Sequence, residues 1–149
     1  MAFRQTPYSQ FNFQVSFGVD PKSPQAGFQE VSGLALEITV AEYRNGNEGD
    51  NAPRKVTGMY KVPDVTCKRG VIGEDTLYSW LNEVRNGSQE ALRTVTIELL
   101  SEDRTTVAQA WKLTGARPIK YTGPQLTGKG TDVAIEEIVF ASERLEITF

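Results

Sequence analysis

Apolar and polar residues alternate with a period of two along most of this chain. In the segment FNFQVSF, Phe11, Phe13, Val15 and Phe17 point to one side of an extended chain, and the polar residues between them point to the other. The same alternation returns in further segments, at residues 34–40, 65–67, 95–99 and 107–113. This period is typical of β-strands with one buried face. The sequence therefore predicts a mainly β fold.

One segment has a helical period instead. Leu77, Trp80, Leu81 and Val84 recur at the spacing i, i+3, i+4, i+7, which places them on one face of an α-helix. Gly87 follows and can adopt the left-handed conformation that ends a helix. We expect the apolar face of this helix to pack into the core.

The last segment, residues 132–149, alternates but changes phase at Glu136–Glu137 and again after Phe140. A strand that swaps faces contains a bulge or bend, as does a strand that moves between two sheets. In total we count about eight strands and one flanking helix, spaced as in an antiparallel barrel or sandwich. The chain shows neither a repeat nor a shift in composition, so we expect one domain over residues 1–149.

The composition argues against most enzyme classes. The chain has no histidine and a single cysteine, Cys67, so His-dependent triads, imidazole or thiolate metal sites and an intrachain disulfide are excluded. The polar stretch at residues 45–51 lacks the ligand spacing of an EF-hand. We predict no catalytic residue, no metal site and no cofactor.

Charge and hydropathy also exclude two kinds of partner. There are 16 Lys and Arg against 19 Asp and Glu, and the resulting net charge of −3 has the wrong sign for general nucleic-acid binding. No run of about 18 apolar residues could span a bilayer. The first ten residues lack the apolar stretch of a secretory signal.

Two segments carry hints of a protein partner. FNFQVSF is aromatic-rich, uncharged and free of proline, which is a hazard on an exposed sheet edge. It either lies inside the sheet or pairs with a neighbouring subunit. The polar segment 44–55 is long for a hairpin connection, and its mixed charges suit contact with another protein. The alternative is a solvated loop.

The order of several motifs resembles the inner-tube proteins of contractile phage tails and contractile injection systems. The motifs are FNFQVSF, FQEVSGL, YRNGNE, GMYKVPDVTCKRGVIGEDTLYSWLNEV and WKLTGARPIKYTGPQLTGKGTDVAIEEIVFASERLEI. The resemblance covers nearly the whole chain. It implies a β-barrel-like fold with one flanking helix, shared with phage tail tubes and with the haemolysin-coregulated ring protein of type VI secretion.

The same resemblance implies a structural role without catalysis. Such subunits form hexameric rings that stack into a hollow tube inside a contractile sheath and conduct cargo. The implied partners are other copies of the chain, sheath protein, baseplate or spike proteins and the cargo or effector. The implied location is a phage-tail-like particle assembled from subunits made in the bacterial cytoplasm without a signal peptide.

Three groups of residues are candidates for the assembly. The hairpin around residues 44–59 reaches the adjacent ring or subunit by family resemblance, and its candidate contacts are Arg44, Asn45, Glu48, Asp50, Arg54 and Lys55. The candidate inter-subunit strand contains Phe11, Phe13, Val15 and Phe17. The polar face of the alternating segments supplies the candidate lumen-facing residues, Glu37, Thr39, Thr94, Thr96 and Glu98.

Two alternatives stay open at this point. One is a type VI secretion ring protein whose rings carry effectors. The other is a monomeric β-barrel that binds a small ligand in an apolar interior pocket.

Overall fold

The computed structural model describes residues 4–18 and 26–149, which contain nine strands and one helix. In chain order these are β1 (Phe13–Ser16), β2 (Glu30–Ser32), β3 (Glu37–Tyr43), β4 (Arg54–Lys61), β5 (Val65–Gly70), α1 (Thr76–Arg85), β6 (Arg93–Leu100), β7 (Val107–Thr122), β8 (Ile135–Ala141) and β9 (Arg144–Thr148). All the strand pairs in these residues are antiparallel. The predicted mainly β antiparallel fold with one flanking helix is confirmed. Of the described segments, none forms a helix with the length and apolarity needed to cross a membrane.

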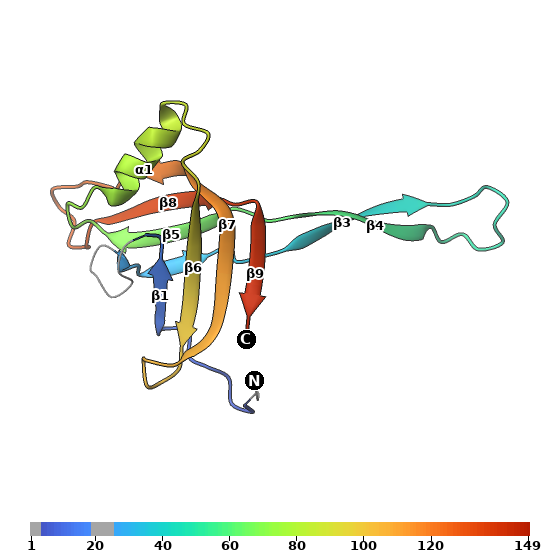
Figure 1. The fold of residues 1–149 in the computed structure, drawn as a ribbon, viewed down its shortest axis with the longest axis horizontal. Helices are drawn as coiled ribbons and strands as arrows, with labels where there is room; N and C mark the ends of the chain where they lie inside the picture. Colours follow the sequence, from blue (N-terminus) through green and yellow to red (C-terminus); the bar gives the residue numbers. More distant parts are fainter. Residues whose placement is uncertain (1–3, 19–25) are drawn as a thin grey trace.

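Two sheets share the long strand β7. The first half of β7 pairs with β6 and β9, and its second half pairs with β8. Sheet A therefore has the order β1-β6-β7-β9, and sheet B has the order β7-β8-β5-β2. In Figure 1 the strands of sheet A run upright and β5 and β8 cross them. This is an orthogonal arrangement in which one strand turns the corner between the sheets.

The corner lies between Gly115 and Lys120. Gly115 has a φ of +67°, which disfavours any residue with a Cβ, and the pairing register with β8 shifts between Pro118 and Lys120. The left-handed residue and the bulge bend β7 from one sheet into the other.

The C-terminal segment consists of two strands, and one of its predicted features is wrong. β8 pairs with β5 along its length without a register shift, so there is no bulge at Glu136–Glu137. Val133 precedes the strand and is exposed, which accounts for the first change of phase. The second change falls in the turn at residues 142–143, where the chain passes from sheet B to sheet A.

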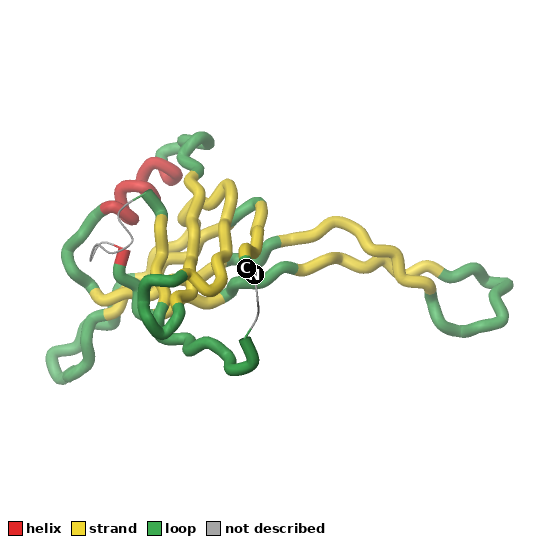
Figure 2. Tube along the Cα trace, turned by 60° about the horizontal axis from the view of Figure 1, so that its bottom comes forward, coloured by secondary structure: helices red, strands yellow, loops and turns green. Residues whose placement is uncertain are grey.

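The core lies between the sheets, and α1 covers one end of it. Leu77 and Trp80 of α1 are buried, as the helical period predicted. The ring centroids of Trp80 and Phe140 lie 5.3 Å apart. Trp80 Nε1 donates a hydrogen bond to the carbonyl of Ala91 at 2.7 Å. Figure 2 shows the helix on the side of the strands away from the long hairpin. The other buried core residues include Val15, Phe17, Val65, Cys67, Val95, Ile97, Leu113, Ile138 and Leu145.

β3 and β4 form a separate two-stranded ribbon that projects far from the body (Figure 1). Every residue of both strands is exposed. The alternation at residues 34–40 predicted a strand with one buried face, and this is wrong for Ile38 and Val40. The physical reason is that no part of the described chain covers either face of the ribbon.

Candidate assembly interface

The ribbon presents apolar side chains to the surroundings. Ile38 and Val40 share one face of β3 because strand side chains alternate, and Tyr60 of β4 lies directly opposite Ile38. These three side chains are 58%, 51% and 51% exposed, and the neighbouring Met59 is 84% exposed. A lone two-stranded hairpin is marginally stable in water. An additional surface that covers this face would stabilise the ribbon.

The loop at the end of the ribbon, residues 44–53, is held by its own hydrogen bonds. Arg44 donates from Nε to the carbonyl of Asp50 at 2.9 Å and from Nη2 to the carbonyl of Glu48 at 3.0 Å. The backbone N–H of Asn45 donates to Glu48 Oε1 at 3.3 Å. Asp50 Oδ1 accepts from the N–H of Ala52 at 3.1 Å. The loop is therefore braced by hydrogen bonds within itself.

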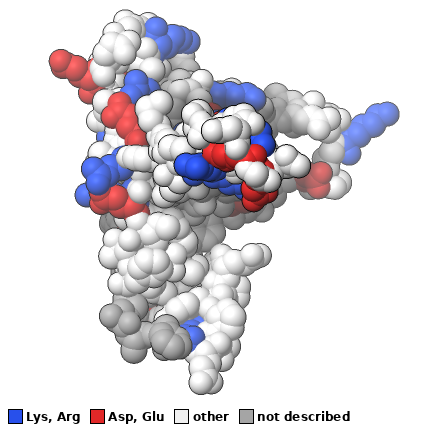
Figure 3. Space-filling model, turned by 90° about the vertical axis from the view of Figure 1, so that its right-hand side faces the viewer, with Lys and Arg blue, Asp and Glu red and all other residues white. Residues whose placement is uncertain are grey.

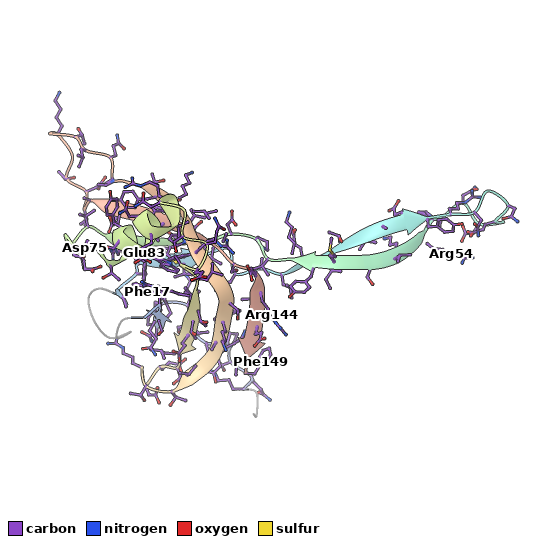
Figure 4. The ribbon with its side chains drawn as sticks, turned by 45° about the horizontal axis from the view of Figure 1, so that its top comes forward. Phe17, Arg54, Asp75, Glu83, Arg144 and Phe149 are labelled. Atoms are coloured by element: carbon purple, nitrogen blue, oxygen red, sulfur yellow. The ribbon has the colours of Figure 1, made fainter. Side chains whose placement is uncertain are left out.

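The six candidate contact residues of the hairpin lie together at this tip. Arg44, Asn45 and Glu48 are half-buried, and their polar atoms make hydrogen bonds within the loop. Asp50, Arg54 and Lys55 are exposed. Arg54 also pairs with Glu48 at 3.2 Å. Figure 3, in which the ribbon points at the viewer, shows positive and negative side chains mixed on this end of the molecule, and Figure 4 places Arg54 near the far end of the ribbon.

The candidate inter-subunit strand forms an edge of sheet A. β1 is the first strand in the sheet order and, among the described residues, pairs with β6 alone. Val15 and Phe17 are buried in the core of their own subunit, Phe13 is half-buried and Phe11 is 69% exposed. In the described part of the chain, the outer backbone edge of β1 is therefore unpaired, and the ring of Phe11 is exposed.

The candidate lumen-facing residues are divided between two elements. Thr94, Thr96 and Glu98 alternate with the buried Val95 and Ile97 of β6, so they lie on the face of sheet A that points away from the core. Glu37 and Thr39 belong to β3 in the ribbon and do not share that face.

The outer face of sheet A is polar across its four strands. Gln14 Nε2 donates to Glu98 Oε1 at 3.4 Å, and Lys112 lies between Thr96 and Glu146 in the strand register. Arg144 pairs with Glu146 at 3.0 Å. Two cations and two anions therefore alternate on this face.

Sequence reasoning missed a buried ion-pair cluster beneath α1. Arg69, which is 3% exposed, contacts Glu136 at 2.7 Å and Glu74 at 3.5 Å, and Tyr121 donates to Glu136 at 2.8 Å. The hydrogen bond to Glu136 raises the pKa of Tyr121, and burial adds to this effect. These residues come from separate segments, so no local pattern in the sequence marks them.

The same cluster borders a cavity of about 340 Å³ that is also lined by Cys67. Cys67 is 1% exposed, and burial raises the pKa of its thiol to about 12. A thiol in this state is inert at neutral pH. In the described part of the chain, no group of three or more acidic or cysteine side chains is placed to hold a metal ion.

The sequence matches the family described as T4-like virus tail tube protein gp19 over residues 9–146. No protein with curated function matches it significantly.

Several solved structures share this fold. A chain of the PVC sheath–tube complex in the extended state, an extracellular contractile injection system, is 29% identical with a TM-score of 0.82, over 95% of this chain and 91% of that one. A chain of the anti-feeding prophage cap, which terminates the tube, is 27% identical with a TM-score of 0.84, over 99% of this chain and 95% of that one. Hcp1 from Flavobacterium johnsoniae is 12% identical with a TM-score of 0.55, over 92% of this chain and 94% of that one, a likeness of fold alone.

Proposed function

Because the chain belongs to the T4-like virus tail tube protein gp19 family, whose members are structural rather than catalytic, we propose that it forms hexameric rings that stack into a hollow tube inside a contractile sheath. The observation that carries this proposal is that, within residues 4–18 and 26–149, both outer strands of sheet A have an unpaired edge and the ribbon is fully exposed. Each is unfavourable in a solitary subunit and is satisfied by contact with other copies.

The ring forms through the two edges of sheet A. β1 and β7 run in one direction, and β6 and β9 run in the other, because each neighbouring pair is antiparallel. If the strands of sheet A run along the ring axis, rotation about that axis keeps their directions, and β9 of one copy meets β1 of the next in antiparallel orientation. Repetition of this head-to-tail contact closes a continuous wall without edges. The C-terminal strand thereby joins Phe11, Phe13, Val15 and Phe17 as a proposed inter-subunit element.

The lumen is lined by the outer face of sheet A, including Thr94, Thr96 and Glu98. Threonine side chains lie among the charged ones on this face, and its charges balance, since Lys112 and Arg144 offset Glu98 and Glu146. A polar wall without net charge lets cargo slide rather than adhere. Glu37 and Thr39 contribute only where the ribbon itself approaches the lumen.

Rings stack through the ribbon tip. The braced loop presents Asp50, Arg54 and Lys55 at the end of an arm that extends well beyond the body (Figure 4). Exposed ion pairs are worth about 0–1 kcal/mol each, so they set register between rings more than strength.

The further partners are sheath, baseplate or spike proteins and the cargo. Support comes from the two more similar solved structures described above, which belong to a sheath–tube complex and to a tube cap. The 149 residues act as one domain of a phage-tail-like particle whose subunits are made in the bacterial cytoplasm.

Imaging of the purified protein tests the proposal. Negative-stain micrographs at moderate concentration are expected to show rings and hollow cylinders, and light scattering a mass far above that of the 16.5 kDa chain. A stable solitary species at every concentration, even with sheath and baseplate proteins supplied, would overturn it.

A further inference from the structure

The barrel is open along one seam. The strand order of the body begins at β1 and ends at β2, and these two strands do not pair with each other. A groove of about 620 Å³ lies at this seam and is bordered by residues of both strands, Phe13 from β1 and Val31 from β2. The seam is therefore an opening that reaches core-facing residues such as Ile97.

The groove is apolar inside and polar at its rim. Its buried or half-buried apolar side chains are Phe13, Val31, Leu34, Ile97, Leu99 and Trp111, and the exposed rings of Tyr8 and Phe11 also border it. Its rim includes Gln10, Gln29 and Glu30, which are exposed. An apolar floor with a polar margin is the composition of a protein-binding surface.

The ribbon carries an exposed apolar surface that could cover the groove, but the ribbon of the same subunit does not lie in it. Ile38, Val40 and Tyr60 form an apolar strip on one face, and the ribbon projects away from the body instead of folding back onto it (Figure 1). Leu34 lines the groove only three residues before β3 begins, so the groove opens at the ribbon's own root. A second ribbon seated there would extend the same apolar surface.

We propose that the seam groove receives the Ile38–Val40–Tyr60 face of the ribbon from a second copy of the chain. This rests on the proposed self-assembly and specifies where the ribbon of each copy binds. Every subunit donates one ribbon and accepts one, which is the head-to-tail contact that builds rings and stacks. The proposed docking uses the side chains that line the groove, whereas the proposed contact with β9 uses the backbone edge of β1.

Inter-chain cross-linking tests this docking. Subunits with Gln29→Cys at the groove rim are mixed with differently tagged subunits with Val40→Cys on the ribbon, and a short bis-maleimide is added. Both positions are exposed, so neither substitution disturbs the core. The expected result is a covalent dimer that contains both tags. The unaltered chain is the blank, because Cys67 is buried and its thiol is inert.

Two control variants, each combined with Gln29→Cys, test whether the cross-link is specific to the Val40 face of the ribbon. Ala41→Cys places the thiol on the opposite face of the ribbon and is expected to give no dimer with Gln29→Cys. Phe149→Cys tests whether the exposed C-terminal residue of a neighbour fills the groove instead. Linkage from Ala41→Cys or Phe149→Cys in place of Val40→Cys contradicts the docking.

Micrographs of the same samples separate the two proposals. Tubes that form without the Gln29–Val40 link overturn the groove docking and leave the tube intact. A solitary subunit that gives no link overturns both.

Discussion

Arg69 of β5 lies directly across from Glu136 of β8 in the strand register, and its Nε donates to Glu136 Oε1 at 2.7 Å. The Arg69 side chain is 4% exposed and that of Glu136 is 14% exposed. A second carboxylate, Glu74, reaches the same guanidinium from the loop before α1. The cluster thus ties the start of the helix to the middle of sheet B.

Arg69→Met is expected to lower the free energy of unfolding by about 3–5 kcal/mol, because it leaves two buried carboxylates without their cation. Arg117→Met is the matched control, since it removes an arginine whose partner Glu143 is 65% exposed. Such a surface pair is worth about 0–1 kcal/mol. Urea unfolding followed by circular dichroism measures both. Equal losses of unfolding free energy in the two variants would show that the buried cluster stabilises the fold no more than an exposed ion pair does.

The charge of Glu74 makes part of this stability depend on pH. Burial alone would raise the pKa of Glu74, but hydrogen bonds from Thr76 and the charge of Arg69 outweigh it and hold the pKa below its ordinary value of 4.5. A carboxylate with a lowered folded-state pKa stabilises the fold above 4.5, and this contribution disappears as the pH falls through the folded-state pKa. The melting temperature of the unaltered chain should therefore exceed that of Glu74→Gln at neutral pH, and the difference should shrink on acidification. A difference that stays constant with pH contradicts this account.

Local patterns predicted the strands and the helix because period two and period 3.6 are properties of neighbouring residues. They could not predict that Ile38 and Val40 are uncovered. Alternation indicates that a strand has two faces, but what covers each face is decided by segments distant in sequence or by another chain. Arg69 and Glu136 were missed for the same reason, since 67 positions separate them.

The candidate residues at the ribbon tip were found together because they lie within one short segment of the sequence, residues 44–55. Glu37 and Thr39 were grouped with Thr94 and Thr96 only by their polar character. The topology separates them, because β3 pairs with β4 in the ribbon and is not part of sheet A.

Gly33 joins β2 to the root of the ribbon in a conformation that other residues avoid. Its φ is +87°, and a Cβ there would lie 2.4 Å from the carbonyl oxygen of Asp64. Gly33→Ala is expected to cost about 1–3 kcal/mol of unfolding free energy, measured in urea. Gly46→Ala, whose Cβ would meet nothing within 4 Å, should change it by less than about 0.5 kcal/mol. An unchanged unfolding free energy in Gly33→Ala would mean that the backbone at the root of the ribbon shifts to accommodate the Cβ at little cost.

Deletion of residues 46–51 is expected to leave the subunit folded but to prevent long tubes. The loop hydrogen bonds described above join residues of the tip to each other, so the body loses none of them. Circular dichroism should retain the melting transition, while negative-stain micrographs should lack extended cylinders. Gly46→Ala serves as the control that still forms tubes. Extended tubes from the deletion variant would show that the loop is not the stacking element.

Reversal of the tip cations, Arg54→Glu with Lys55→Glu, is expected to weaken stacking more at low salt than at high salt. Exposed charges act over a Debye length of about 10 Å at 0.1 M salt but only about 3 Å at 1 M, so added salt hides the new repulsion. Tube length in micrographs, followed against sodium chloride concentration, measures the effect. The double variant Lys120→Glu with Lys129→Glu makes the same change in net charge at exposed positions of the body and should leave tube length unaltered. If the control variant shortens the tubes equally, net charge rather than the tip controls stacking. If the tip variant shortens the tubes equally at all salt concentrations, the substitutions act by changing the shape of the tip rather than its charge.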